Sequence, residues 1–275
     1  MLSITSNYET LIAIQALRRT NNDLRAVDRQ IATGLKVGSP KDDGAIWSIA
    51  QQQRSEIASL NVVKGSLVRG QSATDVAIAA GENVVGILSQ MKAKALAASD
   101  TSLTNNERSA LNDDFVALKE ELAALVTMAE FDGINLIEDN AVDFSAIANT
   151  SGVGKITVKA QDLSLGGPNV TVSATASMNN APQASSMINT VEQSIQNVTK
   201  AVARLGTGHS ALTRHFDFVS KLQDTMEAGV SHLVDADLTK AASLREALLA
   251  RQEMGVQSLS IANRMPTLLA SLFRD

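Results

Sequence analysis

The chain has 275 residues, of which 44% are hydrophobic, 3% aromatic and 19% charged, and its formal net charge is −5. This apolar content is sufficient for a buried core, which excludes a wholly disordered chain. The acidic balance argues against nucleic-acid binding, because a nucleic-acid binder needs a basic surface against phosphates. The absence of cysteine excludes a disulfide scaffold, a cysteine nucleophile and a cysteine-ligated metal.

Membrane and export signals are missing from the sequence. No run of about 20 apolar residues is present, so we expect no membrane insertion. The N-terminus lacks a basic segment followed by an apolar segment and a cleavage site, so we expect no cleaved signal peptide. These features indicate a cytoplasmic protein, unless a dedicated export machine reads a different signal.

The first predicted element is an amphipathic helix near the N-terminus, followed by a long rod helix. The apolar stripe of the first helix needs a partner surface, and it consists of Leu11, Ile14, Leu17, Leu24, Val27 and Ile31. From Val63 to Ala95, apolar or small residues recur at alternating intervals of four and three, the period of a left-handed coiled coil. Several of these residues are glycine or alanine, which allow a neighbouring backbone to approach closely.

A third helix and a small β region are predicted next. Thr104 and Glu107 form a capping box that starts a helix over about residues 107–129, which we expect to fold back on the rod. Farther on, Lys155–Lys159 and Asn169–Ser173 alternate polar and β-branched residues on either side of Leu165–Pro168. This pattern predicts a small β-hairpin or meander.

The last predicted elements are a second rod and an amphipathic C-terminal helix. The interval of four and three runs from Val191 to Leu233, and only His209 and Gln223 interrupt its apolar character. At about 1.5 Å per residue this seam spans roughly 60 Å, far more than a compact globule needs. The C-terminal stripe contains Ala241, Leu244, Leu248, Leu259, Ala262, Leu269 and Phe273.

Together these elements predict a mainly α fold: long antiparallel coiled-coil helical rods, paired terminal helices and a small β-hairpin region at the outer end. We expect three parts, which are residues 1–40 with 236–275 as terminal helices, residues 41–145 with 183–235 as the rod domain, and residues 146–182 as a β-rich outer tip. Both terminal stripes are predicted to form an assembly interface, because neither has a sufficient partner within one monomer.

Two acidic clusters are the candidates for chemistry: Asp42 with Asp43, and Asp235 with Asp237 near His232. A carboxylate and imidazole site for Zn or Mn is one interpretation. Capping of a helix N-terminus by these carboxylates is the other, and we favour it. No nucleophile and base arrangement is recognisable around the three histidines. The sequence therefore predicts no metal site, no cofactor and no enzyme.

Several motifs resemble bacterial flagellin, the subunit of the flagellar filament. Ala32–Lys36 followed by Ser39–Asp43 resembles the N-terminal signature of that family, and Phe131–Leu136 is similar to its Phe-Asn-Gly turn. Near the C-terminus, Asp235–Asp237 and Ala262–Pro266, followed by residues 268–274, resemble its ending. The short middle of the chain is typical of alphaproteobacterial flagellins.

The resemblance implies a structural subunit that polymerises into the filament used for swimming motility. It implies that the terminal helices pair in the filament core, with the rods in the next shell and the tip facing solvent. The implied partners are other copies of the chain, the flagellar export apparatus, a secretion chaperone, the filament cap and hook-associated proteins. The implied location is extracellular, in the bacterial flagellum, with export that needs no cleaved signal peptide.

Two other classes of protein share parts of this pattern. The hook-filament junction protein has similar paired terminal helices, although Gly44 and Ala45 after Asp43 and the apolar residues 268–273 favour flagellin. A cytoplasmic coiled-coil signalling protein also has long seams of this period, but it needs transmembrane or adaptor-binding elements that are not seen in this sequence. An enzyme is the weakest alternative, because no catalytic constellation is present.

Overall fold

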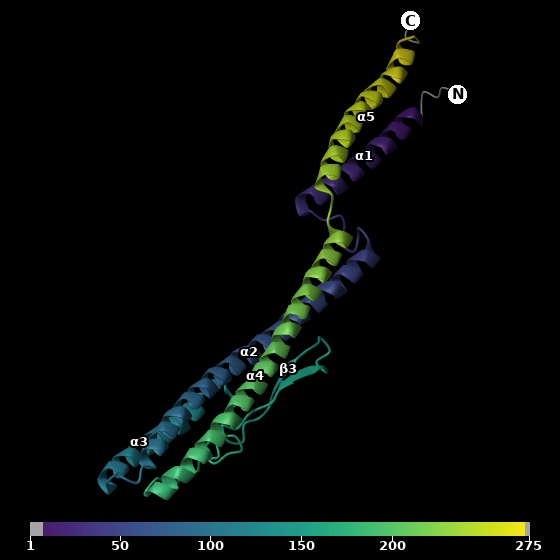
Figure 1. Cartoon of the computed structure of the whole chain (residues 1–275). Helices are drawn as coiled ribbons and strands as arrows, with labels where there is room; N and C mark the ends of the chain where they lie inside the picture. Colours follow the sequence, from purple (N-terminus) through teal and green to yellow (C-terminus); the bar gives the residue numbers. More distant parts are fainter. Residues whose placement is uncertain (1–7, 273–275) are drawn as a thin grey trace. The chain divides into compact units, whose positions relative to one another are not determined.

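The computed structural model describes residues 8–272, with the side chains of residues 8–264. These residues form a mainly α structure, which confirms the predicted fold class (Figure 1). The helices are α1 (Tyr8–Thr33), α2 (Gly44–Ala98), α3 (Asn105–Met128), α4 (Ala181–Val234) and α5 (Leu238–Leu272). Two small antiparallel strand pairs complete it: β1 (Glu130–Phe131) with β2 (Ile134–Asn135), and β3 (Phe144–Ile147) with β4 (Lys155–Val158).

The described residues divide into two compact units. One combines the residues up to Ser55 with those from Thr225 onward, and we call it the terminal unit. The other comprises Glu56–Asp224, and we call it the rod unit. No helix in the described part of the chain combines the length and the apolar character needed to cross a bilayer.

In the rod unit, α2 and α4 lie side by side as antiparallel helices (Figure 1). From Gln71 to Asp75 α2 advances by four residues, while from Thr213 to His209 α4 goes back by four, and each residue contacts its counterpart. Farther along, the two helices are linked again with the same offset. The pairs with this offset are Gln71 with Thr213, Asp75 with His209, and Lys92 with Glu192, and Lys64 also donates to Gln223 Oε1 at 3.3 Å.

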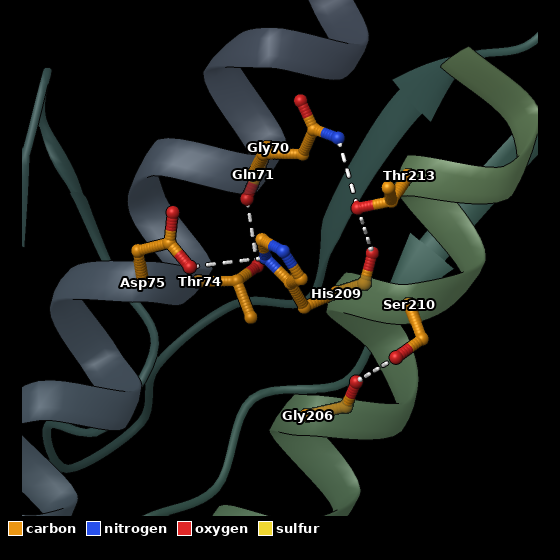
Figure 2. Close-up of polar contacts among 8 residues, drawn as sticks. All are labelled: Gly70, Gln71, Thr74, Asp75, Gly206, His209, Ser210 and Thr213. Atoms are coloured by element: carbon orange, nitrogen blue, oxygen red, sulfur yellow. Dashed lines mark hydrogen bonds and ion pairs between the residues drawn. The ribbon is translucent and has the colours of Figure 1, made fainter. Parts of the chain in front are cut away.

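Figure 2 shows the polar residues around His209 between α2 and α4. His209 Nδ1 lies 3.1 Å from Asp75 Oδ1, but the two are not aligned for a hydrogen bond. Beside them, Gln71 Nε2 donates to Thr213 Oγ1 at 3.0 Å, and Thr74 Oγ1 donates to the Gly70 carbonyl at 2.6 Å. Gln71 and Thr74 thus have hydrogen-bond partners at this level, whereas His209 Nδ1 lies near Asp75 without one.

The predicted seam of α2 is buried along its whole length, and its small residues make close packing possible. A Cβ atom on Gly70 would collide with the Phe144 ring, and one on Gly81 would lie 2.5 Å from Val202 Cγ2. The absence of a side chain at these two positions lets β3 and α4 pack closely on α2. The buried seam residues are Val63, Leu67, Gly70, Thr74, Ala77, Gly81, Val84, Leu88, Met91 and Ala95.

The capping box of α3 forms as predicted. Thr104 Oγ1 accepts from the Glu107 backbone N–H, and Glu107 Oε2 accepts from the Thr104 backbone N–H at 2.9 Å. The Thr104 backbone N–H and hydroxyl, which both donate to Glu107 Oε2, hold the pKa of the Glu107 carboxyl below its usual value. One turn farther, buried Arg108 donates to the carbonyls of Ala98 and Asp100, which satisfies the C-terminal end of α2. The fold-back of α3 onto the rod is thereby fixed at the connection.

The β region differs from the sequence-based expectation in its pairing. Lys155–Val158 is a strand, but its partner is Phe144–Ile147 and not the predicted segment around Val170. Val170 and Val172 are fully buried while Thr171 between them is exposed, so the alternation is real. This segment packs against α4, however, where the Thr171 backbone N–H donates to Ser194 Oγ at 3.0 Å. Burial against a helix produces the same alternating pattern as burial in a hairpin.

Candidate assembly interface

The terminal helices α1 and α5 lie side by side and antiparallel (Figure 1). Three polar pairs connect them, and their spacing is matched on both helices. Asn21 lies seven residues before Asp28 on α1, and Gln252 lies seven residues after Arg245 on α5. The pairs are Asp28 Oδ1 with Arg245 Nε at 2.8 Å, Asn21 Oδ1 with Gln252 Nε2 at 2.7 Å, and Thr10 Oγ1 with Asn263 Oδ1 at 3.3 Å.

The apolar seam between these helices is small. Val27, Ala241 and Leu248 are 4%, 6% and 4% exposed, and Leu24 packs against them. Gly255 faces Leu17, whose Cδ1 lies 3.3 Å from the place where a Cβ on Gly255 would stand. The seam therefore joins one helix pair, and the core cluster contains residues of α1 and α5 only among the described residues.

The predicted assembly stripe divides into two groups. Leu24, Val27, Ala241 and Leu248 form the seam, and Ile14, Leu17, Leu259 and Ala262 are half-buried. Leu11, Ile31 and Leu244 are 61%, 36% and 45% exposed. Phe273 lies outside the described residues, and so does the side chain of Leu269.

Leu244 belongs to the predicted C-terminal stripe, and its side chain is 45% exposed. The residues that face α1 are Ala241, Arg245, Leu248 and Gln252, which alternate by four and three. Leu244 lies one residue before Arg245 and at the edge of this row. The row of Ala241, Leu248 and Gly255 faces α1, and the assignment of the whole stripe to an assembly interface stays a prediction.

Exposed apolar residues outside the predicted stripes also occur on α1 and α5. Ile12 is 51% exposed on α1, and Met254, Val256 and Ile261 are 57%, 53% and 67% exposed on α5. Met254 and Ile261 are seven residues apart, so a search for a second heptad row on the same helix finds both. Together with Leu11 and Leu244 they give the helix pair an apolar surface outside its own seam.

The two segments that connect the helices of this unit are tied to each other by backbone hydrogen bonds. Gly34, with φ +71°, ends α1 in the left-handed conformation that favours glycine. Its carbonyl accepts from the Ala236 N–H at 2.8 Å, and Leu35 pairs with Asp235 in an isolated antiparallel bridge. The Val234 carbonyl accepts from Lys36 N–H at 2.7 Å. This clamp holds the entry to α5 beside the exit from α1.

The acidic residues act mostly on the backbone of these connections. Asp43 Oδ1 accepts from the Ala45 and Ile46 N–H groups, both at 3.0 Å, and so caps α2. Asp237 Oδ1 accepts from the Lys240 N–H at 3.0 Å and caps α5. Asp235 contributes its backbone to the bridge with Leu35.

Asp42 organises the turn before α2. Its Oδ2 accepts from the Ser39 hydroxyl at 2.9 Å, from the Ser39 N–H at 3.0 Å and from the Gly38 N–H at 3.2 Å. The Ser39 hydroxyl, followed by the backbone N–H groups, lowers the pKa of this carboxyl. Within the described residues, no group of three or more His, Cys, Asp or Glu side chains is placed to hold a metal ion. The carboxylates of Asp42, Asp43 and Asp237 instead accept hydrogen bonds from nearby turns and helix N-termini.

Comparison with known proteins places these features in a family context. The family model described as the bacterial flagellin N-terminal helical region matches residues 4–141, and that of the C-terminal helical region matches residues 188–273. The chain is 44% identical over 272 residues to Flagellin FljM of Caulobacter vibrioides, covering 99% of this chain and 98% of that protein. It is 31% identical to a flagellin of Brucella melitensis over the full length of both.

A solved structure shares the fold. A Vibrio parahaemolyticus structure assigned to a flagellar hook-associated protein aligns with a TM-score of 0.56 and 14% sequence identity, covering 70% of this chain and 100% of that chain. At this identity the likeness concerns the fold alone. The full-length sequence similarity is to flagellins.

Proposed function

The chain belongs to the bacterial flagellin family, and on this premise we propose that its α1–α5 pair is the part through which subunits pack in the filament. Flagellins are the structural subunits of the extracellular flagellar filament, and this chain is such a subunit. The proposal concerns which side chains make the contacts. The seam around Leu248 joins α1 to α5 within one subunit, and the apolar surface outside the seam contacts neighbouring subunits.

The exposed apolar residues of α1 and α5 carry this proposal. Leu11, Ile12, Leu244, Met254, Val256 and Ile261 are between 45% and 67% exposed. Scattered apolar side chains are normal on a soluble protein, but a concentration on one helix pair is typical of a surface that another chain covers. A filament supplies such a cover for every subunit, since each copy presents the same surface.

Charge supports an apolar contact. Residues 1–36 and residues 238–275 each contain five Lys or Arg against three Asp or Glu. Both ends therefore have the same net sign, and attraction between opposite net charges does not hold them together. Burial of apolar surface is the remaining source of cohesion, at roughly 25 cal/mol per Å².

Assembly of single-residue variants tests the proposal. Met254→Asp and Ile261→Asp should each prevent filament growth from seeds, because a carboxylate in a buried apolar contact is strongly unfavourable. Arg251→Asp is the matched control, because Arg251 is an exposed charged residue on the same helix. Filament mass is measured by sedimentation and by negative-stain microscopy. Normal growth of both variants would contradict the proposed contact surface.

We extend the proposal to partners and location. As a flagellin, the chain would leave the cell through the flagellar export apparatus without a cleaved signal peptide, with the help of a secretion chaperone. It would then meet the filament cap and hook-associated proteins, and it would have no catalytic role. Mass spectrometry of the secreted protein in strains with and without a working export apparatus tests this, because a retained N-terminus and secretion that depends on the apparatus are both required.

A further inference from the structure

We propose that the polar pairs across the α1–α5 seam set the register of this helix pair. This inference rests on the proposed function, because it assigns a specificity role to residues within the same assembly element. The three pairs join Asp28 to Arg245, Asn21 to Gln252 and Thr10 to Asn263. Their offsets agree, so all three are satisfied only in one register.

The apolar seam alone gives little register information. Its buried members are Val27, Ala241 and Leu248, and it continues toward Gly255 and Leu17. Ala241, Leu248 and Gly255 recur every seven residues, so a slide by one heptad, about 10.5 Å, still sets small or apolar residues against one another. Something other than apolar contact must therefore distinguish the registers.

The polar residues make each slide unfavourable. In the observed register Ile14 stands opposite Leu259, because both lie seven residues beyond the Asn21 and Gln252 pair, and both are half-buried. A slide by one heptad in one direction puts Asn21 against Leu259. A slide in the other direction puts Ile14 against Gln252. Either slide leaves an amide without a partner beside an apolar side chain, which costs free energy that the observed register does not.

The charged pair of Asp28 and Arg245 also favours the observed register. Asp28 and Arg245 side chains are 47% and 45% exposed, so their attraction is modest. After the slide that puts Asn21 against Leu259, Asp28 faces Gln252, and Arg245 has no α1 residue opposite it, because α1 ends at Thr33. A polar residue within a coiled-coil seam commonly fixes register in this way, at some cost in stability.

Cysteine cross-linking measures the register directly, because the chain has no cysteine of its own. The in-register probe is Leu17→Cys with Gly255→Cys, and the probe for a slide of one heptad is Leu17→Cys with Ala262→Cys. Full-length protein carrying each probe is oxidised both as monomer and in seeded filaments. The intrachain product is then separated from interchain dimers by electrophoresis.

Exchange of the charges is the first test. Asp28→Arg and Arg245→Asp should each lower the in-register product by about fivefold, because two like charges then face each other. Asp28→Arg combined with Arg245→Asp should restore it. Asp23→Arg and Arg251→Asp are the matched controls, since they make the same charge changes at exposed positions of the same helices. Failure of the combined variant to recover, or an equal loss in the controls, would overturn the proposal.

Removal of polarity is the second test, and it separates register from stability. Asn21→Leu with Gln252→Leu should keep the helices paired but raise the ratio of slid to in-register product by about tenfold. An unchanged ratio would overturn the register role. Filament yield from the same preparations reports on the proposed function separately, because a subunit can lose assembly while its cross-link ratio stays as in the parent.

Discussion

The rod unit and the terminal unit use the same helix pairing but bury it to different extents. In the rod unit, α2 and α4 are joined by α3 and β3, and large side chains such as Leu67, Leu88 and Phe115 are fully buried. In the terminal unit, α1 and α5 bury a core cluster of Val27, Ala241 and Leu248. Two helices alone cannot enclose a core, because each exposes the side opposite its partner. Pairing of two helices therefore gives a seam, and a third element on the pair is needed for an enclosed core.

The largest expected effect separates the two units in the monomer. Limited proteolysis should remove about the first 35 and the last 40 residues and leave a helical rod, because exposed backbone with few buried contacts opens most readily. Mass spectrometry of the fragments checks the boundaries. Equal resistance of the ends and the rod would show that the seam of α1 and α5 is sufficient without neighbours.

Next in size is Leu248→Asp in the seam of the terminal unit. Loss of a buried Leu costs on the order of 2–5 kcal/mol even as Ala, and an unpaired carboxylate adds more. We expect no filaments, while the circular dichroism of the monomer keeps most of its helical signal. Arg251→Asp, at an exposed position three residues on, should assemble nearly as the parent does. A monomer that loses most of its helix would mean that the rod depends on this seam.

A pair of glycine substitutions should give smaller effects of opposite sign. Gly70→Ala places a Cβ against the Phe144 ring in the rod, and overpacking of this kind costs about 1–3 kcal/mol. Gly255→Ala meets only the end of the Leu17 side chain at 3.3 Å, so the gain in helix propensity of about 1 kcal/mol should prevail. Thermal unfolding of monomers and of filaments measures both. Equal changes in unfolding temperature for the two substitutions would contradict the expectation that the rod seam is packed more tightly than the terminal seam.

The smallest expected effect is the pH dependence contributed by the α3 capping box. Hydrogen bonds from Thr104 lower the folded-state pKa of the Glu107 carboxyl, so its contribution to stability is present above the usual pKa of Glu. It is lost as the pH falls through the lowered value. Glu107→Gln should therefore reduce the unfolding temperature of the rod at pH 7 and have less effect at pH 2. A pH-independent difference between the variant and the parent would contradict this linkage.

The Phe131–Leu136 motif, which carries part of the family resemblance, forms a tight turn. Asp132 and Gly133 have φ of 51° and 75°, so the β1–β2 connection has positive φ at both central residues, as a type I′ hairpin requires. Asn135 follows it with its Oδ1 accepting from Ile137 N–H at 2.9 Å. Such local chemistry depends on few residues, and this is why short motifs identified it.

Local sequence was enough to predict the helical period, the capping box at Thr104 and the buried seam from Val63 to Ala95, because each depends on residues close together in the chain. The division into terminal, rod and tip parts at residues 40, 145, 182 and 235 stays a prediction. The pairing of β4 with Phe144–Ile147 came from the fold alone, since it depends on where a distant segment packs. An alternating or heptad pattern fixes which residues are buried together, whereas the identity and phase of the partner come from contacts between elements far apart in the chain.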